Sequence, residues 1–222
     1  MARALPLPLE TVLLDVDGTI LDTREFILAA FEHAFREQGL PPPPRDDLAR
    51  FVGMKQLEVI YGGFAGSRAA AMAAAHRDFQ RANLALAVPF PGAAETLAQL
   101  RGAGLALGAV TSRSRRTSTA SLAQHGFDRF FSAVISAEDV SRLKPDPEPL
   151  AAALALLGRG AAGAVMIGDA PADIEAGKAA GMFTVAATYG FHGPAVLSSG
   201  PDASIGAIAE LPAALGVAPA GP

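Results

Sequence analysis

The sequence predicts an α/β protein, a doubly wound parallel sheet with an all-helical domain inserted after its first strand. Short apolar runs such as Val12–Leu14 are typical of strands buried on both faces of a parallel sheet. From Pro91 onward such runs alternate with helical segments, which is the order of elements in α/β domains. Between Asp22 and Pro89 no run is typical of a strand. These observations favour one sheet that is interrupted by a helical insertion.

The inserted segment begins with a helix, because apolar residues recur at spacings of three and four from Phe26 to Phe35. Gly39 ends this helix, and the prolines that follow form a stiff connector. We then expect a short helix from Asp46 to Phe51, a segment around Leu57–Tyr61 and a long Ala-rich helix over Ser67–Leu86. Residues 23–87 thus form the predicted helical insertion, and residues 1–22 with 88–222 form the α/β domain.

The second half of the chain predicts the rest of the sheet. Expected strands lie at Leu105–Val110, Ala133–Ser136, Ala164–Ile167 and Phe183–Ala186, with an edge strand at Ala203–Ile205. Expected helices lie at Gly92–Arg101, Arg115–His125, Pro147–Leu157 and Pro171–Ala180.

Composition narrows the function class. The 222 residues are 50% apolar with a net charge of −4, and no basic run favours nucleic acid as a partner. Cysteine is absent, which excludes disulfides, thiolate metal sites and a cysteine nucleophile. We expect no signal peptide and no membrane span, because Met1–Pro8 has no long apolar core and the apolar runs are shorter than the about 20 residues that span a bilayer. We expect a soluble cytoplasmic protein, a monomer or homodimer, with no membrane partner.

Two carboxylates follow the first strand. Asp15 and Asp17 lie two residues apart, so their side chains point the same way at the carboxyl end of a buried strand. Open α/β sheets bind their ligands at this edge, and ionised carboxylates there require a cation or strong donors. Gly18 turns the chain away at once. The same sequence is also typical of an acidic β-turn on the surface. The residues that follow the later strands must distinguish these two interpretations.

Three further polar clusters follow later segments of the chain. Thr111-Ser112 suits an anion site at a helix N-terminus, or an ordinary helix cap. Lys144 is one of only three lysines against fifteen arginines, and a compact ammonium suits a point contact to a phosphoryl oxygen. A solvated lysine at the start of a helix is the alternative. Asp169 and Asp173 favour Mg²⁺, with helix capping as the alternative.

Together these clusters resemble the four motifs of the haloacid dehalogenase (HAD) superfamily. Residues 15–22 resemble the first motif. The second, third and fourth motifs are matched in the family's order by Thr111, by Lys144 and by Gly168-Asp169 with Asp173. The helical insertion is similar to the family's small helical cap, and the core would then be Rossmann-like. Residues 144–149 and 175–181 are most similar to the phosphoglycolate phosphatase and pyrophosphatase branches.

The resemblance implies a Mg²⁺-dependent phosphatase that hydrolyses a small phosphorylated metabolite through an aspartyl-phosphate. Asp15 would be the nucleophile and Asp17 the general acid and base. Phosphate would be bound by Thr111, the amide of Ser112, and Lys144. The metal would be held by Asp15, Asp169 and the main-chain carbonyl of Asp17, with Asp173 orienting metal-bound water or Lys144.

Some residues and activities remain open at this stage. Gly53, Lys55 and Arg113 are candidate contacts for the substrate or within the cap. A sugar phosphomutase similar to β-phosphoglucomutase keeps both Asp15 and Asp17 and is the main alternative. A phosphonate hydrolase would replace Asp17 and use a cap lysine such as Lys55. A binding domain without turnover is the alternative from another functional class.

Overall fold

The computed structural model of the protein describes residues 4–52 and 57–218. The chain forms two compact units. The first contains the residues up to Asp22 and those from Pro89 onward, and the second spans Thr23–Val88. We call them the core unit and the helical unit. Within the described ranges, no helix is both long enough and apolar enough to cross a membrane.

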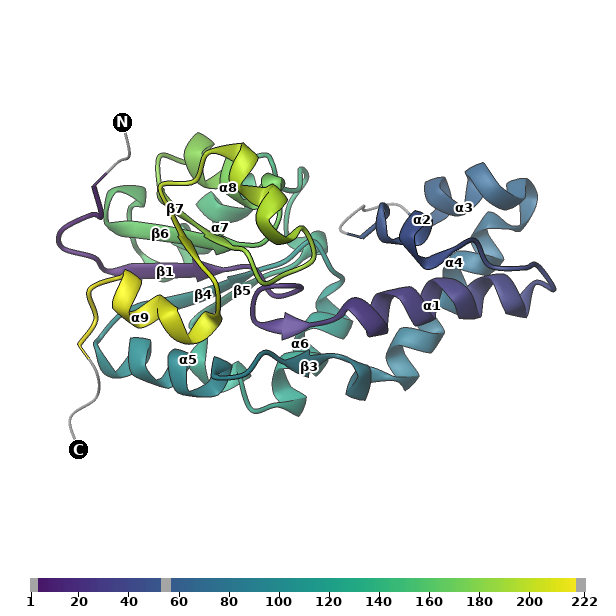
Figure 1. Cartoon of the computed structure of the whole chain (residues 1–222), viewed down its shortest axis with the longest axis horizontal. Helices are drawn as coiled ribbons and strands as arrows, with labels where there is room; N and C mark the ends of the chain where they lie inside the picture. Colours follow the sequence, from purple (N-terminus) through teal and green to yellow (C-terminus); the bar gives the residue numbers. More distant parts are fainter. Residues whose placement is uncertain (1–3, 53–56, 219–222) are drawn as a thin grey trace. The chain divides into compact units, whose positions relative to one another are not determined.

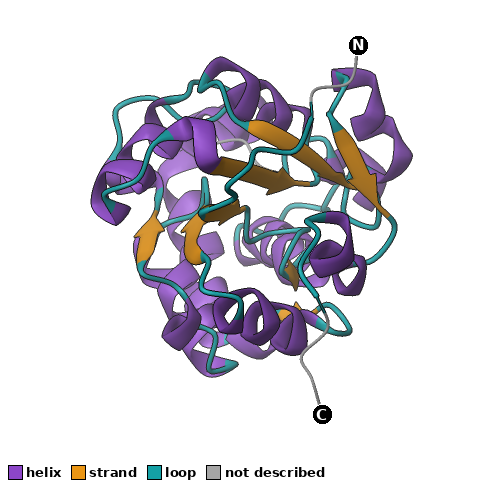
Figure 2. Ribbon diagram, turned by 90° about the vertical axis from the view of Figure 1, so that its left-hand side faces the viewer, coloured by secondary structure: helices purple, strands orange, loops and turns teal. Residues whose placement is uncertain are grey.

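The core unit is built on a six-stranded parallel sheet, which confirms the predicted fold class (Figures 1 and 2). Its strand order is β5-β4-β1-β6-β7-β8, and the expected edge strand, β8, lies at one end. The strands are β1 (Thr11–Leu14), β4 (Ala106–Val110), β5 (Ala133–Ile135), β6 (Ala164–Gly168), β7 (Phe183–Ala187) and β8 (Ala203–Ile205).

Helices pack on both faces of this sheet, with α7 and α8 on one side and α5 and α9 on the other (Figure 1). The helices of the core unit are α5 (Ala93–Gly102), α6 (Arg115–Gln124), α7 (Glu148–Leu157), α8 (Pro171–Ala179) and α9 (Leu211–Ala214). Under α7 and α8, side chains such as Leu13, Leu150 and Met166 form a closely packed apolar core. This burial on both faces explains why the strands are continuous apolar runs.

The register of the central strands determines where the site can form. Leu14, the last residue of β1, pairs with Ala109 of β4 on one side and with Ile167 of β6 on the other. The three strands therefore end at nearly the same level. The residues that follow them, Asp15 among them, emerge together at the carboxyl edge of the sheet.

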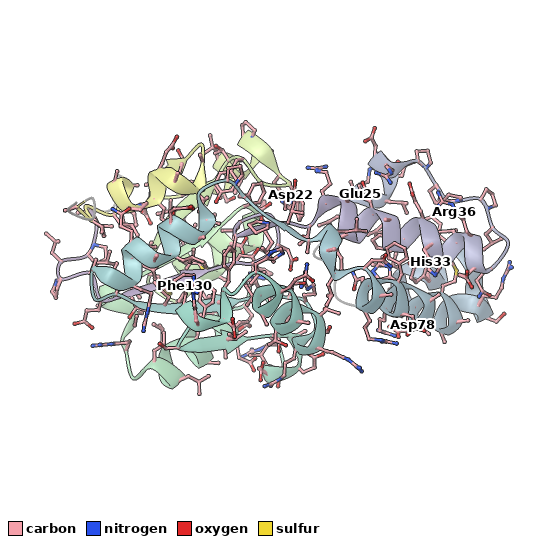
Figure 3. The ribbon with its side chains drawn as sticks, turned by 90° about the horizontal axis from the view of Figure 1, so that it is seen from below. Asp22, Glu25, His33, Arg36, Asp78 and Phe130 are labelled. Carbon is pink, nitrogen blue, oxygen red and sulfur yellow. The ribbon has the colours of Figure 1, made fainter. Side chains whose placement is uncertain are left out.

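The helical unit contains α1 (Arg24–Glu37), α2 (Arg45–Ala49), α3 (Leu57–Ala65) and α4 (Ala69–Ala82). Its apolar core includes Phe31, Phe35, Leu48 and Met72. On its surface Arg45 of α2 is hydrogen-bonded to both Glu25 and Glu32 of α1. Figure 3 shows Glu25, His33 and Arg36 along α1.

Two details differ from the sequence prediction. The expected continuous helix over Ser67–Leu86 is divided into short 3₁₀ helices at Gly66–Arg68 and Leu84–Leu86, with α4 between them. Helix α4 ends because the Asn83 side chain donates to the Phe79 carbonyl, an alternative to the helical backbone bonds. The structure also contains α9 and two-residue strands β2 (Leu21–Asp22) and β3 (Val88–Pro89), which pair with each other.

One buried polar pair lies in the core of the helical unit. The Tyr61 hydroxyl is 2.9 Å from Nδ1 of His76, and the edge of the His76 ring packs against Phe31. His76 is only 2% exposed, and this burial lowers its pKa to about 3. The imidazole is therefore held neutral in the folded protein.

We expect the stability of the protein to depend on pH through His76. The unfolded chain binds a proton near pH 6.5, whereas folded His76 does not do so until about pH 3. Its stabilising contribution is therefore fully present above pH 6.5. It is lost as the pH falls from 6.5 toward 3, by up to about 1.4 kcal/mol per pH unit.

Urea unfolding from pH 4 to 8 tests this dependence. The difference in unfolding free energy between wild type and His76→Gln should shrink steadily below pH 6.5. His125→Gln removes a histidine from the core unit and serves as the matched control. A difference that does not change with pH would contradict the neutral, buried state of His76.

Candidate active site

A lysine and two aspartates meet at the carboxyl edge of the sheet. The Lys144 ammonium lies 2.6 Å from a carboxylate oxygen of Asp15 and 2.6 Å from one of Asp173. Its third contact is a 2.9 Å hydrogen bond to the carbonyl of Val110, the last residue of β4. Asp15 follows β1, and its backbone N–H donates to Ile167 of β6. This ammonium therefore links the ends of two strands to the start of α8.

Asp169 and Asp173 follow β6, as the sequence predicts. Asp173 lies in the first turn of α8, where its second oxygen accepts the Ala170 N–H at 3.0 Å. Asp169 is 2% exposed and accepts the Phe191 N–H at 2.6 Å. Across the described parts of the chain, Asp15, Asp169 and Asp173 form the group whose ligand atoms all lie within 4.8 Å of one another.

This cluster carries a surplus of negative charge. Burial raises the pKa of the Asp15 carboxyl well above its usual range, with Asp173 and Asp169 adding to the effect and Lys144 opposing it. Burial likewise raises the pKa of Asp169, while its contacts with His192 and Phe191 oppose the rise. Burial alone would lower the pKa of Lys144, but the carboxylates of Asp15 and Asp173 outweigh it and raise it. The single buried ammonium of Lys144 cannot neutralise three buried carboxylates, so the charge of the cluster favours the binding of a further cation.

The donor set fits a hard divalent ion. Carboxylate oxygens are the ligands that Mg²⁺ prefers, and three of them converge here in a nearly solvent-free position. Because Asp173 is already paired with Lys144 through one oxygen and with a backbone amide through the other, Asp15 and Asp169 are the better placed ligands.

A second set of contacts joins Asp17 to Thr111 and Arg113. The Thr111 hydroxyl donates to Oδ2 of Asp17 at 3.1 Å, and the Arg113 guanidinium donates to Oδ1 of Asp17 at 2.7 Å. Asp17 thus has partners different from those of Asp15, although the two residues are neighbours in sequence. Ser112, the residue between Thr111 and Arg113 in the sequence, is partly buried.

The structure places the other predicted contacts as follows. Arg113 contacts Asp17 and α6, where its guanidinium also donates to the Thr117 carbonyl and the Ser121 hydroxyl. Gly53 and Lys55 lie outside the described residues.

The sequence analysis did not identify the segment after β7, which contacts Asp169. The chain leaves β7 and continues through Tyr189, Gly190 and Phe191, and the Phe191 amide holds Asp169. Gly190 packs so closely that an added Cβ would overlap with the Asp169 side chain and the Gly18 carbonyl. The signal was a glycine three residues after the end of the buried strand β7, at the same sheet edge as Asp15. Only a glycine allows this close approach.

The fold and these residues define a hydrolase of the haloacid dehalogenase type. Residues 12–187 match the family model described as haloacid dehalogenase-like hydrolase, and the chain belongs to this family. The resemblance stated from the sequence is therefore confirmed.

The chain is also similar to individual proteins of this family. The chain is 32% identical over 217 residues to the phosphoglycolate phosphatase (plasmid) of Cupriavidus necator, with 94% of both sequences covered. It is 34% identical over 189 residues to Pyrophosphatase PpaX of Bacillus velezensis, covering 85% of this chain and 87% of the relative. The solved structure of a HAD-superfamily hydrolase, subfamily IA, variant 1, from Geobacter sulfurreducens aligns with a TM-score of 0.73 at 25% identity. That alignment covers 93% of this chain and 96% of the other. The enzyme class predicted from the sequence, a hydrolase with phosphatase relatives, is confirmed.

We expect Gly190→Ala to weaken Mg²⁺ binding by about 10- to 100-fold, the usual effect of disturbing a residue that supports a metal ligand. The added methyl group must displace Asp169 or the Gly18 backbone. Isothermal titration calorimetry with MgCl₂ measures the affinity. Gly160→Ala is the control, because a Cβ there meets nothing within 4 Å. Unchanged affinity in Gly190→Ala would exclude Asp169 as a metal ligand.

Proposed function

We propose that the protein is a Mg²⁺-dependent phosphatase that hydrolyses a small phosphorylated metabolite through an aspartyl-phosphate on Asp15. The observation that carries the proposal is the Asp15 carboxylate, held at a strand end by Lys144 with Asp169 close by. Its relatives named phosphoglycolate phosphatase and pyrophosphatase support a compact phosphorylated substrate. The helical unit has the position in the chain of a cap domain, directly after the first motif.

In the first half of the proposed reaction, a carboxylate oxygen of Asp15 attacks phosphorus while the bond from phosphorus to the leaving oxygen breaks. Asp17 gives its proton to that leaving oxygen. Lys144, Thr111 and the amide of Ser112 stabilise the phosphoryl oxygens during the transfer. Mg²⁺, held by Asp15, Asp169 and the main-chain carbonyl of Asp17, would neutralise phosphoryl charge when bound.

In the second half, water attacks the phosphorus of the aspartyl-phosphate and gives its proton to the Asp17 carboxylate. The bond between Asp15 and phosphorus breaks, which regenerates the carboxylate and releases inorganic phosphate. Asp173 has no direct part in bond making. By binding Lys144 at 2.6 Å it fixes the ammonium beside Asp15.

We expect Asp15→Asn to abolish phosphate release, a loss on the order of 10⁴-fold or more in kcat, because the amide cannot act as the nucleophile. Phosphate release from para-nitrophenyl phosphate, with Mg²⁺ and with a chelator, measures this. Asp128→Asn, at an exposed aspartate of the core unit, is the matched control. Near-full activity of a folded Asp15→Asn protein would overturn the nucleophile assignment. Wild-type protein without metal-dependent turnover would favour a binding domain.

A panel of phosphorylated metabolites ranked by kcat/KM tests the substrate class. We expect phosphoglycolate or pyrophosphate to rank above sugar phosphates and nucleoside monophosphates. β-Glucose 1-phosphate is included because a sugar phosphomutase would convert it to glucose 6-phosphate without net release of phosphate. That result would replace the phosphatase proposal with the mutase alternative.

A further inference from the structure

The Asp17 carboxylate is bound at both of its oxygens by one short segment of chain. Oδ1 accepts from the Arg113 guanidinium at 2.7 Å, and Oδ2 accepts from the Thr111 hydroxyl at 3.1 Å. The Thr111 hydroxyl oxygen in turn accepts the backbone N–H of Arg113 at 3.1 Å. Asp17, Thr111 and Arg113 thus form a closed ring of hydrogen bonds. Such a ring fixes the position of the carboxylate.

Arg113 is itself held firmly. One terminal nitrogen of its guanidinium binds Asp17, and the other donates at 2.6 Å both to the Thr117 carbonyl and to the Ser121 hydroxyl. These two acceptors lie on α6, so the guanidinium connects the helix to Asp17. The Arg113 side chain is 9% exposed, and the Asp17 side chain 15%. An ion pair this far from solvent keeps its geometry better than one at the surface, because water competes less for its donors.

The residue type suits this task. A guanidinium presents several N–H groups in a rigid plane and can bind a carboxylate on one side while it donates to a helix on the other. A lysine ammonium is a point charge and lacks this fixed fork. In the same site the chain uses Lys144, whose three acceptors surround a single nitrogen. The two cations are therefore matched to two different geometries.

We propose that Arg113 is a positioning residue that holds the Asp17 carboxyl in place for proton transfer. This inference rests on the proposed function, in which Asp17 protonates the leaving oxygen. It differs from a contact between Arg113 and an anionic substrate, because the guanidinium is directed to Asp17 and α6 within the core unit. Its effect should appear wherever the reaction needs the Asp17 proton, and be small where the leaving group departs without one.

The test compares two aryl phosphates of similar size. Phenyl phosphate has a poor leaving group that requires protonation, whereas 2,4-dinitrophenyl phosphate has a good one that does not. We expect Arg113→Met to lower kcat/KM for phenyl phosphate by about 10²-fold, the lower end of general acid–base catalysis. For 2,4-dinitrophenyl phosphate the loss should be less than about fivefold. The kcat/KM of Arg113→Lys for phenyl phosphate should lie between that of wild type and that of Arg113→Met.

Arg116→Met is the matched control, since it removes an exposed arginine from the first turn of α6, three residues after Arg113, and should resemble wild type. Asp17→Asn and the double variant Asp17→Asn with Arg113→Met complete the set. If Arg113 acts through Asp17, its replacement should change kcat/KM for phenyl phosphate by less than about twofold once Asp17 is already Asn, because coupled residues are not additive. Circular dichroism verifies folding. Should Arg113→Met fail to fold, Arg113→Gln is measured in the same way.

The outcomes separate this inference from the proposed function. Equal losses for both aryl phosphates, or a loss that persists in the Asp17→Asn background as a raised KM, would show that Arg113 binds substrate and would overturn the inference. If kcat/KM for phenyl phosphate were the same in Arg113→Met and Arg116→Met, the inference would also be overturned. In that case an inactive Asp17→Asn protein would leave the proposed function intact. Full turnover of phenyl phosphate by Asp17→Asn would instead overturn the acid role of Asp17 itself.

Discussion

The buried ammonium of Lys144 is the interaction on which the candidate site depends. Its three N–H donors face three acceptors: the carboxylates of Asp15 and Asp173, and the Val110 carbonyl. Removing one partner of a buried ion pair costs about 3–5 kcal/mol, because the remaining charge stays buried without compensation. The contact therefore joins the ends of β1 and β4 to the first turn of α8 as well as serving the proposed chemistry. A guanidinium, broad and planar, could not place one nitrogen among these three acceptors.

The same interaction leaves a charge imbalance that the function can use. One ammonium cannot neutralise three buried carboxylates, and burial accordingly raises the pKa of Asp15 and Asp169. A divalent cation would complete the balance and allow a phosphoryl group to approach. The three carboxylates can pack this closely because glycines occupy neighbouring positions at which a larger side chain would overlap with them. An added Cβ at Gly18 or Gly190 would overlap with Asp169, and one at Gly168 would overlap with Asp173.

Much of this arrangement could be predicted from the sequence, for a physical reason. A parallel sheet brings the carboxyl ends of its strands to one edge, so polar residues that follow buried apolar runs meet there. That rule alone predicts that Asp15, Thr111 and Asp169 lie at the same edge of the sheet. The contact between Asp17 and Arg113, 96 residues apart in sequence, could not be found in this way. It depends on the conformation of the Arg113 side chain, which lies before α6 and contacts both this helix and Asp17. The end of α4 at Asn83 likewise depends on one local side-chain hydrogen bond, which helical periodicity does not reveal.

The two acids of the first motif are separated by one residue and differ in every partner. Asp15 is 6% exposed and lies among Lys144, Asp169 and Asp173, where burial and like charges oppose ionisation unless a cation is present. Asp17 is turned to a guanidinium and a hydroxyl, and it does not belong to the acidic group. The two carboxylates therefore have different partners, and the proposed reaction gives them different tasks, with Asp15 as the nucleophile and Asp17 as the proton donor. The proposed reaction needs this division, because the Asp15 oxygen that attacks phosphorus must be unprotonated while the leaving oxygen must receive a proton. A divalent cation beside Asp15 would favour the unprotonated form of that carboxylate, as the Lys144 ammonium already does.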